Sequence, residues 1–199
     1  TDPDLAGGRE NVVRIVKEAV RGGVSVVQLR DKEASDEQIE HTARELLAVL
    51  GDVPLFINDR VEVAAKLGCH LHIGQDDMAF REARRMLSDE QLIGLSIGNH
   101  AELAAISDDT RPDVIGIGPV YSTNTKKNAP AGMGPDAAAA LARAARERGI
   151  DSVAIGGIKD HNAHELAGSD FAGICVVSDI MAAKDPAAAA ARLKEAFHG

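Results

Sequence analysis

A loop rich in hydroxyl and ammonium groups follows one apolar run near the middle of the chain. Residues 114–117 are mostly branched and apolar, as in a β-strand, and Gly118-Pro119 ends the run. The loop then carries hydroxyl donors and positive charge at Thr123, Thr125, Lys126 and Lys127. This pattern predicts a phosphate-binding loop at the carboxyl end of a strand. The alternative is a solvated Thr/Lys loop without a ligand, and the rest of the chain must distinguish the two interpretations.

A second set of polar residues ends the run of apolar residues 24–29. Gln28, Arg30 and Lys32 alternate along the chain, so they share one side of an extended segment. Unpaired cations are costly to bury, and an anionic ligand at the strand end would compensate them. The alternative is ion pairing with Asp31, Glu33 or another nearby carboxylate.

Two aspartates follow the next two expected strands, at 54–57 and 69–73. Asp59 and Asp77 could share a hard cation, because Mg²⁺ takes one or two carboxylates together with phosphate oxygens. A magnesium ion there would lie beside Arg30 and Lys32, which suits a pyrophosphate ligand. His70 and His72 could instead suggest zinc, but no further ligands occur at a suitable spacing, and zinc is not favoured.

Small and hydroxyl residues end three of the remaining expected strands. Ser96 follows one of them, and Gly157 and Ser178 follow the last two. Backbone N–H groups after the last strands of a barrel often bind phosphate, and glycine allows close approach. No activated nucleophile is recognisable. The two anion sites therefore favour joining two phosphorylated substrates without a covalent enzyme intermediate.

Composition narrows the class of protein. The 199 residues fit one domain, which we expect to span 1–199, and 45% are hydrophobic but only 3% aromatic, as in a buried parallel sheet. A formal net charge of −9 disfavours binding to nucleic acid or to an anionic membrane. Cys69 and Cys175 form no disulfide framework, and with no signal peptide in view we expect a cytoplasmic protein.

Helical and strand patterns alternate along the chain. Helices are expected at 9–21, 35–50, 61–67, 81–87, 99–107, 135–148 and 162–166 and from Asp185 onward, with strands at 24–29, 54–57, 69–73, 92–96, 114–118, 152–155 and 174–177. This order predicts parallel βα units. We expect a (β/α)₈ TIM barrel rather than an open doubly wound sheet, because polar residues end almost every strand. Its first strand would have to precede Thr1.

Taken in order, these motifs resemble those of the thiamine phosphate synthase family. The resemblance spans residues 28–178 and is carried by Gln28-Leu-Arg-Asp31-Lys32, Asn58-Asp59, His72-Ile-Gly-Gln-Asp-Asp77, Gly94-Leu-Ser96, Gly118-Pro, Thr123-Asn124-Thr125-Lys126-Lys127, Gly156-Gly157 and Val177-Ser178. Each motif alone is weak, but the ordered set is specific. The chain departs from the family pattern at 68–71, which is one residue shorter, and at 169–173, which is longer.

The resemblance implies a TIM-barrel enzyme that joins hydroxymethylpyrimidine pyrophosphate to thiazole phosphate and releases pyrophosphate. It implies a dissociative, Mg²⁺-dependent reaction with the metal on Asp59 and Asp77. Pyrimidine pyrophosphate would be held by Gln28, Arg30, Asp31, Lys32, Asn58, Ser96 and Lys126, of which Arg30, Lys32, Ser96 and Lys126 would act in catalysis. Thiazole phosphate would be held by Thr123, Asn124, Thr125, Gly157, Val177 and Ser178.

Two other functions remain open from the sequence. A thiazole tautomerase on the same barrel would need neither the metal nor the pyrophosphate cluster. A non-catalytic barrel that binds phosphorylated metabolites would have a disabled metal site, and Asp59 and Asp77 are both present. The chain could also form a homo-oligomer or be fused to another domain.

Overall fold

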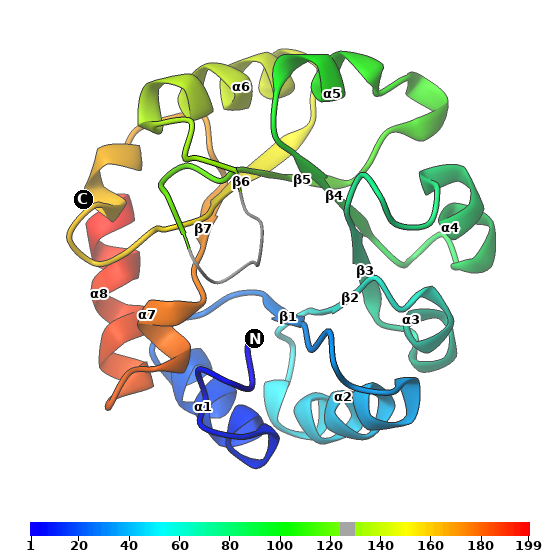
Figure 1. Cartoon of the computed structure of the whole chain (residues 1–199), viewed down its shortest axis with the longest axis vertical. Helices are drawn as coiled ribbons and strands as arrows, with labels where there is room; N and C mark the ends of the chain where they lie inside the picture. Colours follow the sequence, from blue (N-terminus) through cyan, green and yellow to red (C-terminus); the bar gives the residue numbers. More distant parts are fainter. Residues whose placement is uncertain (124–129) are drawn as a thin grey trace.

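The computed structural model describes residues 1–123 and 130–199. Seven parallel strands form one sheet in the order β1 to β7, so each strand pairs with its neighbour in sequence. The strands are β1 (Val27–Leu29), β2 (Leu55–Asn58), β3 (His70–Ile73), β4 (Ile93–Ile97), β5 (Val114–Ile117), β6 (Asp151–Ile155) and β7 (Gly173–Cys175). Because consecutive parallel strands curve round one axis, the fold is a TIM-like α/β barrel (Figure 1).

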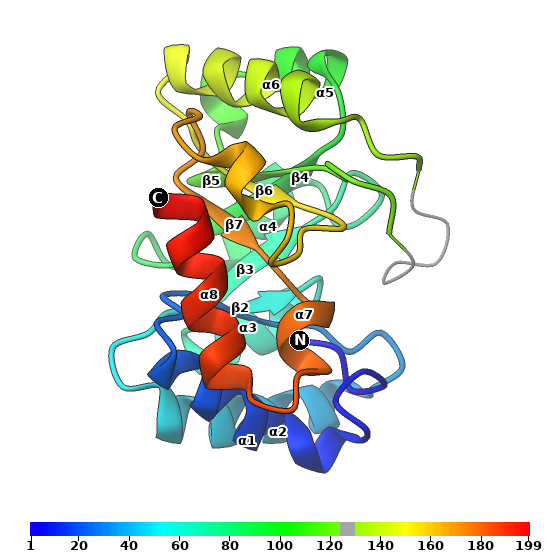
Figure 2. The same ribbon diagram turned by 90° about the vertical axis from the view of Figure 1, so that its left-hand side faces the viewer.

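The helices surround the sheet (Figures 1 and 2). They are α1 (Arg9–Arg21), α2 (Asp36–Leu50), α3 (Val61–Leu67), α4 (Phe80–Met86), α5 (His100–Ala105), α6 (Pro135–Glu147), α7 (Ser178–Met181) and α8 (Pro186–His198), with short 3₁₀ turns at Asp108–Thr110 and Ala163–Leu166. No helix among the residues described is long and apolar enough to span a membrane.

Alternation along β1 and β3 separates two environments. In β1, Val27 and Leu29 are buried against the helices, whereas Gln28 between them is half-buried and faces the barrel interior. In β3, Leu71 and Ile73 are buried in the same way, and His70 and His72 face inward. The outer side chains build the apolar core, and the inner side chains are free to be polar. This arrangement confirms the expected orientation of Gln28.

The N-terminus lies beside β1. The amino group of Thr1 donates to the Gln28 carbonyl at 2.7 Å, and its hydroxyl pairs with both the N–H and the carbonyl of Arg30. Helices α1 and α8 pack against each other, which brings the first and last helices together at this side of the barrel (Figure 1). Thr1 therefore satisfies backbone groups on the edge of β1 that β2 does not cover.

Most expected elements are confirmed, and the differences occur at element ends. The capping box of Ser35 and Gln38 and the N-caps Asn99 and Asp185 are all present. The strand expected over 24–29 begins only at Val27, since the N–H of Val24 still bonds back to Ala19 in the turn after α1. The last strand ends at Cys175, because Val177 leaves the extended conformation to cap α7.

The contact between α1 and α8 requires glycine at position 22. A Cβ atom on Gly22 would lie 2.1 Å from the backbone carbonyl oxygen of Ala187. We expect Gly22→Ala to lower the free energy of unfolding by about 1–3 kcal/mol, through steric clash alone, because the φ of Gly22 is an ordinary −78°. Urea denaturation measures the change. Gly173→Ala is the matched control, since its Cβ would make an ordinary 3.9 Å contact with Val153, and equal stability of the two variants would contradict the prediction.

Candidate active site

Three neighbouring strand ends bring the basic and acidic candidates together. Lys32, which follows β1, forms an ion pair with Asp59, which follows β2. The N–H of Asp59 donates to the His72 carbonyl of β3 at 2.9 Å, and this bond fixes its place in the sheet. Asp59 has a φ of 63°, and it is the one non-glycine residue described with a positive φ. Such a conformation is costly and is often found at functional sites.

Asp59 and Asp77 lie close enough to interact directly. Burial raises the pKa of Asp59, a hydrogen bond with Asp77 raises it further, and Lys32 acts in the opposite direction. The carboxylate of Asp77 also accepts a hydrogen bond from the N–H of Gly74 at 2.7 Å. Two carboxylates whose mutual repulsion favours protonation form a donor set that a divalent cation would stabilise. No group of three or more metal-binding side chains occurs in the part of the chain that the structure describes.

Arg30 and Lys32 differ in their partners. Lys32 forms an ion pair with Asp59, so for Lys32 the structure shows pairing with a nearby carboxylate, which was the alternative to an anionic ligand. Arg30 bonds Thr1 through its backbone, and its guanidinium makes no ion pair with any carboxylate in residues 1–123 and 130–199. Arg30 is therefore available to an anionic ligand.

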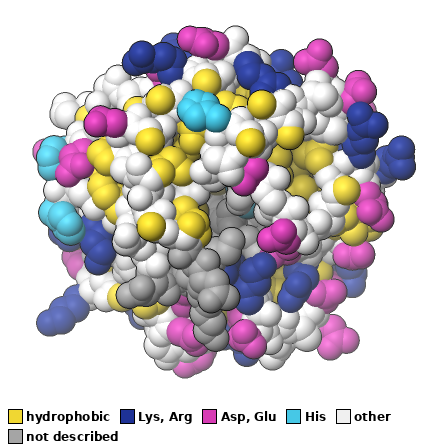
Figure 3. Space-filling view, turned by 45° about the horizontal axis from the view of Figure 1, so that its top comes forward, with side chains coloured by type: hydrophobic (Ala, Val, Ile, Leu, Met, Phe, Trp, Pro, Cys, Tyr) yellow, Lys and Arg dark blue, Asp and Glu magenta, His cyan; other side chains and the backbone are white. Residues whose placement is uncertain are grey.

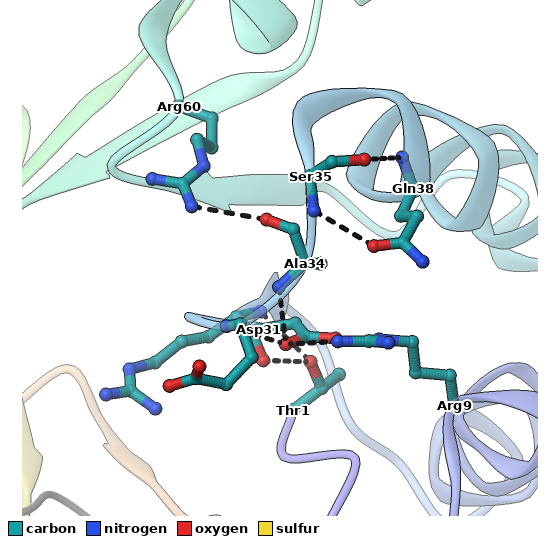
Figure 4. Close-up of polar contacts among 9 residues, drawn as sticks. Thr1, Arg9, Asp31, Ala34, Ser35, Gln38 and Arg60 are labelled. Atoms are coloured by element: carbon teal, nitrogen blue, oxygen red, sulfur yellow. Dashed lines mark hydrogen bonds and ion pairs between the residues drawn. The ribbon is translucent and has the colours of Figure 1, made fainter.

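Asp31 is held by the protein itself (Figure 4). Its carboxylate accepts hydrogen bonds from Arg9 of α1 and from the N–H groups of Glu33 and Ala34, each of the latter at 3.1 Å. Burial acts to raise the pKa of Asp31, but the Arg9 guanidinium and the backbone N–H donors outweigh it and lower the pKa. These contacts fix the turn that carries Arg30 and Lys32. Binding of substrate by Asp31 stays a prediction.

His72 faces the barrel interior. The sequence marked it as a possible zinc ligand and as part of a family motif, but gave it no role in substrate binding. Its Nε2 lies 3.0 Å from the hydroxyl oxygen of Ser96 on β4. His70, two residues earlier, accepts from the N–H of Leu92 at 3.0 Å and packs on Phe56. The alternation of strand residues was the signal that both imidazoles face inward. Neither of them is joined by further zinc ligands among the residues described.

Burial lowers the pKa of His72 to about 4, although the charge of Asp77 opposes this shift. The unfolded chain would bind a proton near pH 6.5, so between pH 6.5 and 4 the unfolded state carries more protons than the folded state. We expect about 3 kcal/mol of stability, present above pH 6.5, to be lost as the pH falls to 4. Urea denaturation of wild type and His72→Gln across this range measures the difference. Parallel pH dependences would contradict the prediction.

The second group of candidates lies where the loops after β5 and β6 meet. The N–H groups of Val120 and Tyr121 donate to the carbonyls of Ile155 and Gly156, both at 2.9 Å. A Cβ on Gly157 would lie 2.7 Å from the Ser122 carbonyl oxygen, and the φ of Gly157 is 66°, so only glycine fits. This packing brings Thr123 and Gly157, two of the expected phosphate contacts, to the same loop pair.

The end of β7 supplies Val177 and Ser178. Ser178 is the first residue of α7, and it lines an open hollow of about 520 Å³ with Lys159, Asp179 and Arg192. Lys159 is paired with Asp179 at 3.4 Å. Figure 3 shows acidic and basic side chains lying close together on one part of the molecule's face.

The predicted site residues thus fall into two groups. The first contains Gln28, Arg30, Lys32, Asn58, Asp59, Asp77 and Ser96, at or near the ends of β1 to β4. The second contains Thr123, Gly157, Val177 and Ser178, beyond the ends of β5 to β7. Asn124, Thr125 and Lys126 lie outside the described residues.

The sequence of this chain is similar to those of known thiamine phosphate synthases. A "Thiamine monophosphate synthase" family profile matches residues 1–180. The "Thiamine-phosphate synthase" of Shouchella clausii is 35% identical over 99% of this chain and 93% of its own length. The "Thiamine biosynthesis multifunctional protein ThiED" of Corynebacterium efficiens is 50% identical over 99% of this chain, which spans only 28% of that relative.

A solved structure agrees with the sequence matches. The "Thiamine phosphate pyrophosphorylase" of Pyrococcus furiosus superposes with a TM-score of 0.73 and 29% identity, covering 93% of this chain and 88% of its own. The family match extends through β1 to α7, the elements that carry both groups of site residues. On sequence and on fold, the chain belongs to the thiamine monophosphate synthase family.

Proposed function

We propose that this chain joins hydroxymethylpyrimidine pyrophosphate to thiazole phosphate, giving thiamine phosphate and pyrophosphate. In this transfer the bond between the pyrimidine methylene carbon and the pyrophosphate oxygen breaks, and pyrophosphate leaves with the electron pair. A bond then forms between the methylene carbon and the thiazole nitrogen. The observation that carries the proposal is the cluster of Arg30, Lys32, Asp59 and Asp77 at three adjacent strand ends.

The first group of residues suits the leaving pyrophosphate. The Arg30 guanidinium is available to pair with phosphate oxygens, and Lys32 would become available once a cation replaces it at Asp59. Opposite charges about 4 Å apart contribute about 4 kcal/mol at an effective dielectric of 20, and each 1.4 kcal/mol or so changes a rate about tenfold. Preorganised cations can therefore supply much of the acceleration. Gln28, Asn58 and Ser96 lie on β1, β2 and β4, where they could hold the pyrimidine ring.

The second group suits the thiazole phosphate. Backbone N–H groups at the Gly156-Gly157 turn and at the start of α7 could bind phosphate, with Thr123, Val177 and Ser178 beside them. Holding the thiazole nitrogen near the pyrimidine carbon would provide proximity and exclude water from the carbocation. By the family resemblance, Asn124 and Thr125 would complete this half of the site, and Lys126 would join the residues that hold the pyrimidine pyrophosphate.

We propose Mg²⁺ as the cofactor, held by Asp59 and Asp77. The chemistry of the donor set supports this, since both ligands are hard oxygen donors, and burial together with the neighbouring Asp77 raises the pKa of Asp59. When bound, the ion would neutralise charge on the departing pyrophosphate. The protein's own part is to hold the two carboxylates, and the φ of 63° and the bond from the N–H of Asp59 to His72 do this for Asp59.

The test is formation of thiamine phosphate from the two purified substrates, with Mg²⁺ and with EDTA. Metal-dependent product is expected. Product that forms equally well in EDTA would overturn the metal assignment, and no product from folded protein would overturn the proposed reaction. In that case, conversion of thiazole tautomers would identify the tautomerase, and binding without turnover would identify a non-catalytic barrel.

The setting of the reaction is also part of the proposal. We propose that residues 1–199 act as one catalytic domain on small-molecule substrates in the cytoplasm. A partner domain joined in the same protein fits the multifunctional relative, of which this chain matches 28%. A homo-oligomer remains the alternative arrangement, and the mass of the natural protein in solution distinguishes the two.

A further inference from the structure

We propose that His72 is a positioning residue that fixes the Ser96 hydroxyl for the pyrimidine substrate, an inference that rests on the proposed function. The imidazole Nε2 is 3.0 Å from the Ser96 hydroxyl oxygen, and the two residues lie on adjacent strands. A serine hydroxyl can otherwise rotate among three staggered positions. With the imidazole in place, one of those positions gains a part-buried hydrogen bond and is favoured over the others.

The space for the imidazole is made by glycine. Gly94 pairs with His72 in the sheet, and a Cβ atom at position 94 would lie 2.4 Å from the imidazole Nδ1. His72 is part-buried, and its ring occupies the space that a Cβ at position 94 would need. A side chain at position 94 would therefore displace His72, which explains why a strand interior carries the otherwise unfavourable glycine here.

Ser96 is also held through its backbone. The side-chain amide of Gln75 donates to the Ser96 carbonyl at 2.7 Å. His72 and Gln75 come from the same segment, the end of β3 and the turn after it, which also carries Asp77. One segment thus holds the Ser96 side chain, the Ser96 backbone and one carboxylate of the proposed metal site. We infer that it sets the pyrimidine position relative to the metal.

The first test compares two alanine substitutions at glycines. Gly94→Ala is expected to displace the imidazole of His72, because the added Cβ would overlap the ring. Gly116→Ala is the matched control, because its Cβ would make an ordinary 3.5 Å contact with the same ring. Gly94→Ala is expected to lower kcat about tenfold and to raise KM for the pyrimidine substrate, with KM for thiazole phosphate unchanged. Equal kinetics of the two variants would overturn the inference.

The second test asks whether His72 acts through Ser96. His72→Phe keeps a ring but removes Nε2, and His72→Gln retains a polar group that can reach the hydroxyl. We expect His72→Phe to lower kcat about tenfold in the wild-type background and to have no further effect in Ser96→Ala. His72→Gln should restore most of the activity. Independent, multiplicative losses from His72→Phe and Ser96→Ala would show that His72 serves only the packing.

A measurement without turnover separates this inference from the proposed reaction. The ¹⁵N resonance of His72 Nε2, identified by its absence in His72→Gln, should shift in Ser96→Ala in the absence of substrate. An unchanged resonance would overturn the hydrogen bond, whatever reaction the protein catalyses. Failure of the wild-type protein to form thiamine phosphate would overturn the proposed function. The resonance would still show whether the hydrogen bond between His72 and Ser96 exists.

Discussion

Replacing Asp59 by asparagine is expected to lower kcat about 100-fold and to raise the Mg²⁺ concentration needed for half-maximal rate. The carboxylate contributes charge to the proposed metal site and neutralises Lys32. Asparagine removes that charge but tolerates the left-handed φ of 63° better than other side chains of similar size. The variant should therefore keep its backbone, and the loss should come from the metal site.

Magnesium titration of the initial rate is the measurement for Asp59→Asn. Asp170→Asn is a suitable control, since Asp170 pairs with Arg143 and Arg146 on the outer surface and should keep the wild-type titration. The raised pKa of Asp59 adds a pH signature. Its carboxyl must lose a proton to bind the cation, so Mg²⁺ affinity should rise with pH in wild type and lose this dependence in Asp59→Asn. A variant with a wild-type magnesium requirement would remove Asp59 from the metal site.

Arg30→Met is expected to lower kcat/KM for the pyrimidine pyrophosphate about 1,000-fold and to change the melting temperature little. Arginine offers several donors to phosphate oxygens, and the lost charge pairing is of order 4 kcal/mol. Stability should be maintained because the guanidinium pairs with no carboxylate in the described part of the chain, while the bonds to Thr1 use backbone atoms of Arg30.

Arg9→Met is the matched variant for this experiment. Arg9 pairs with Asp31 in the turn that carries Arg30, but the pair lies between α1 and that turn (Figure 4). Its loss should lower the melting temperature and affect kcat/KM much less than the loss of Arg30 does. Steady-state kinetics and thermal unfolding of both variants provide the comparison. A stable Arg30→Met enzyme with wild-type kcat/KM would exclude Arg30 from pyrophosphate binding.

Local signals in the sequence determined much of the fold. The apolar period of residues 9–21 matches α1. Helix α2 begins after the capping box at Ser35, and α8 begins at Pro186 with Asp185 as its N-cap. The order of strands and helices predicted parallel pairing, and seven strands pair in sequence order. These features depend on neighbours within a few residues, which is the range over which periodicity, capping and turn preference act.

Sequence also placed the candidate residues at strand ends, because parallel strands present all their carboxyl ends at one rim. It could not determine how those residues pair. Whether Lys32 bonds Asp31, Glu33 or Asp59 depends on the distance between β1 and β2 and on the unusual φ of Asp59. The Arg9–Asp31 pair likewise joins residues 22 apart in sequence.

The environment of His72 was decided by tertiary structure alone. Its neighbours in sequence give no sign that Gly94, on another strand, leaves room for the ring or that Ser96 lies within hydrogen-bond distance. Both facts follow from the register of β3 against β4, which pairs His72 with Gly94. Sequence by itself therefore determined the elements, their order and the rim. Register and packing decided which side chains meet, because those contacts join residues that only the folded sheet brings together.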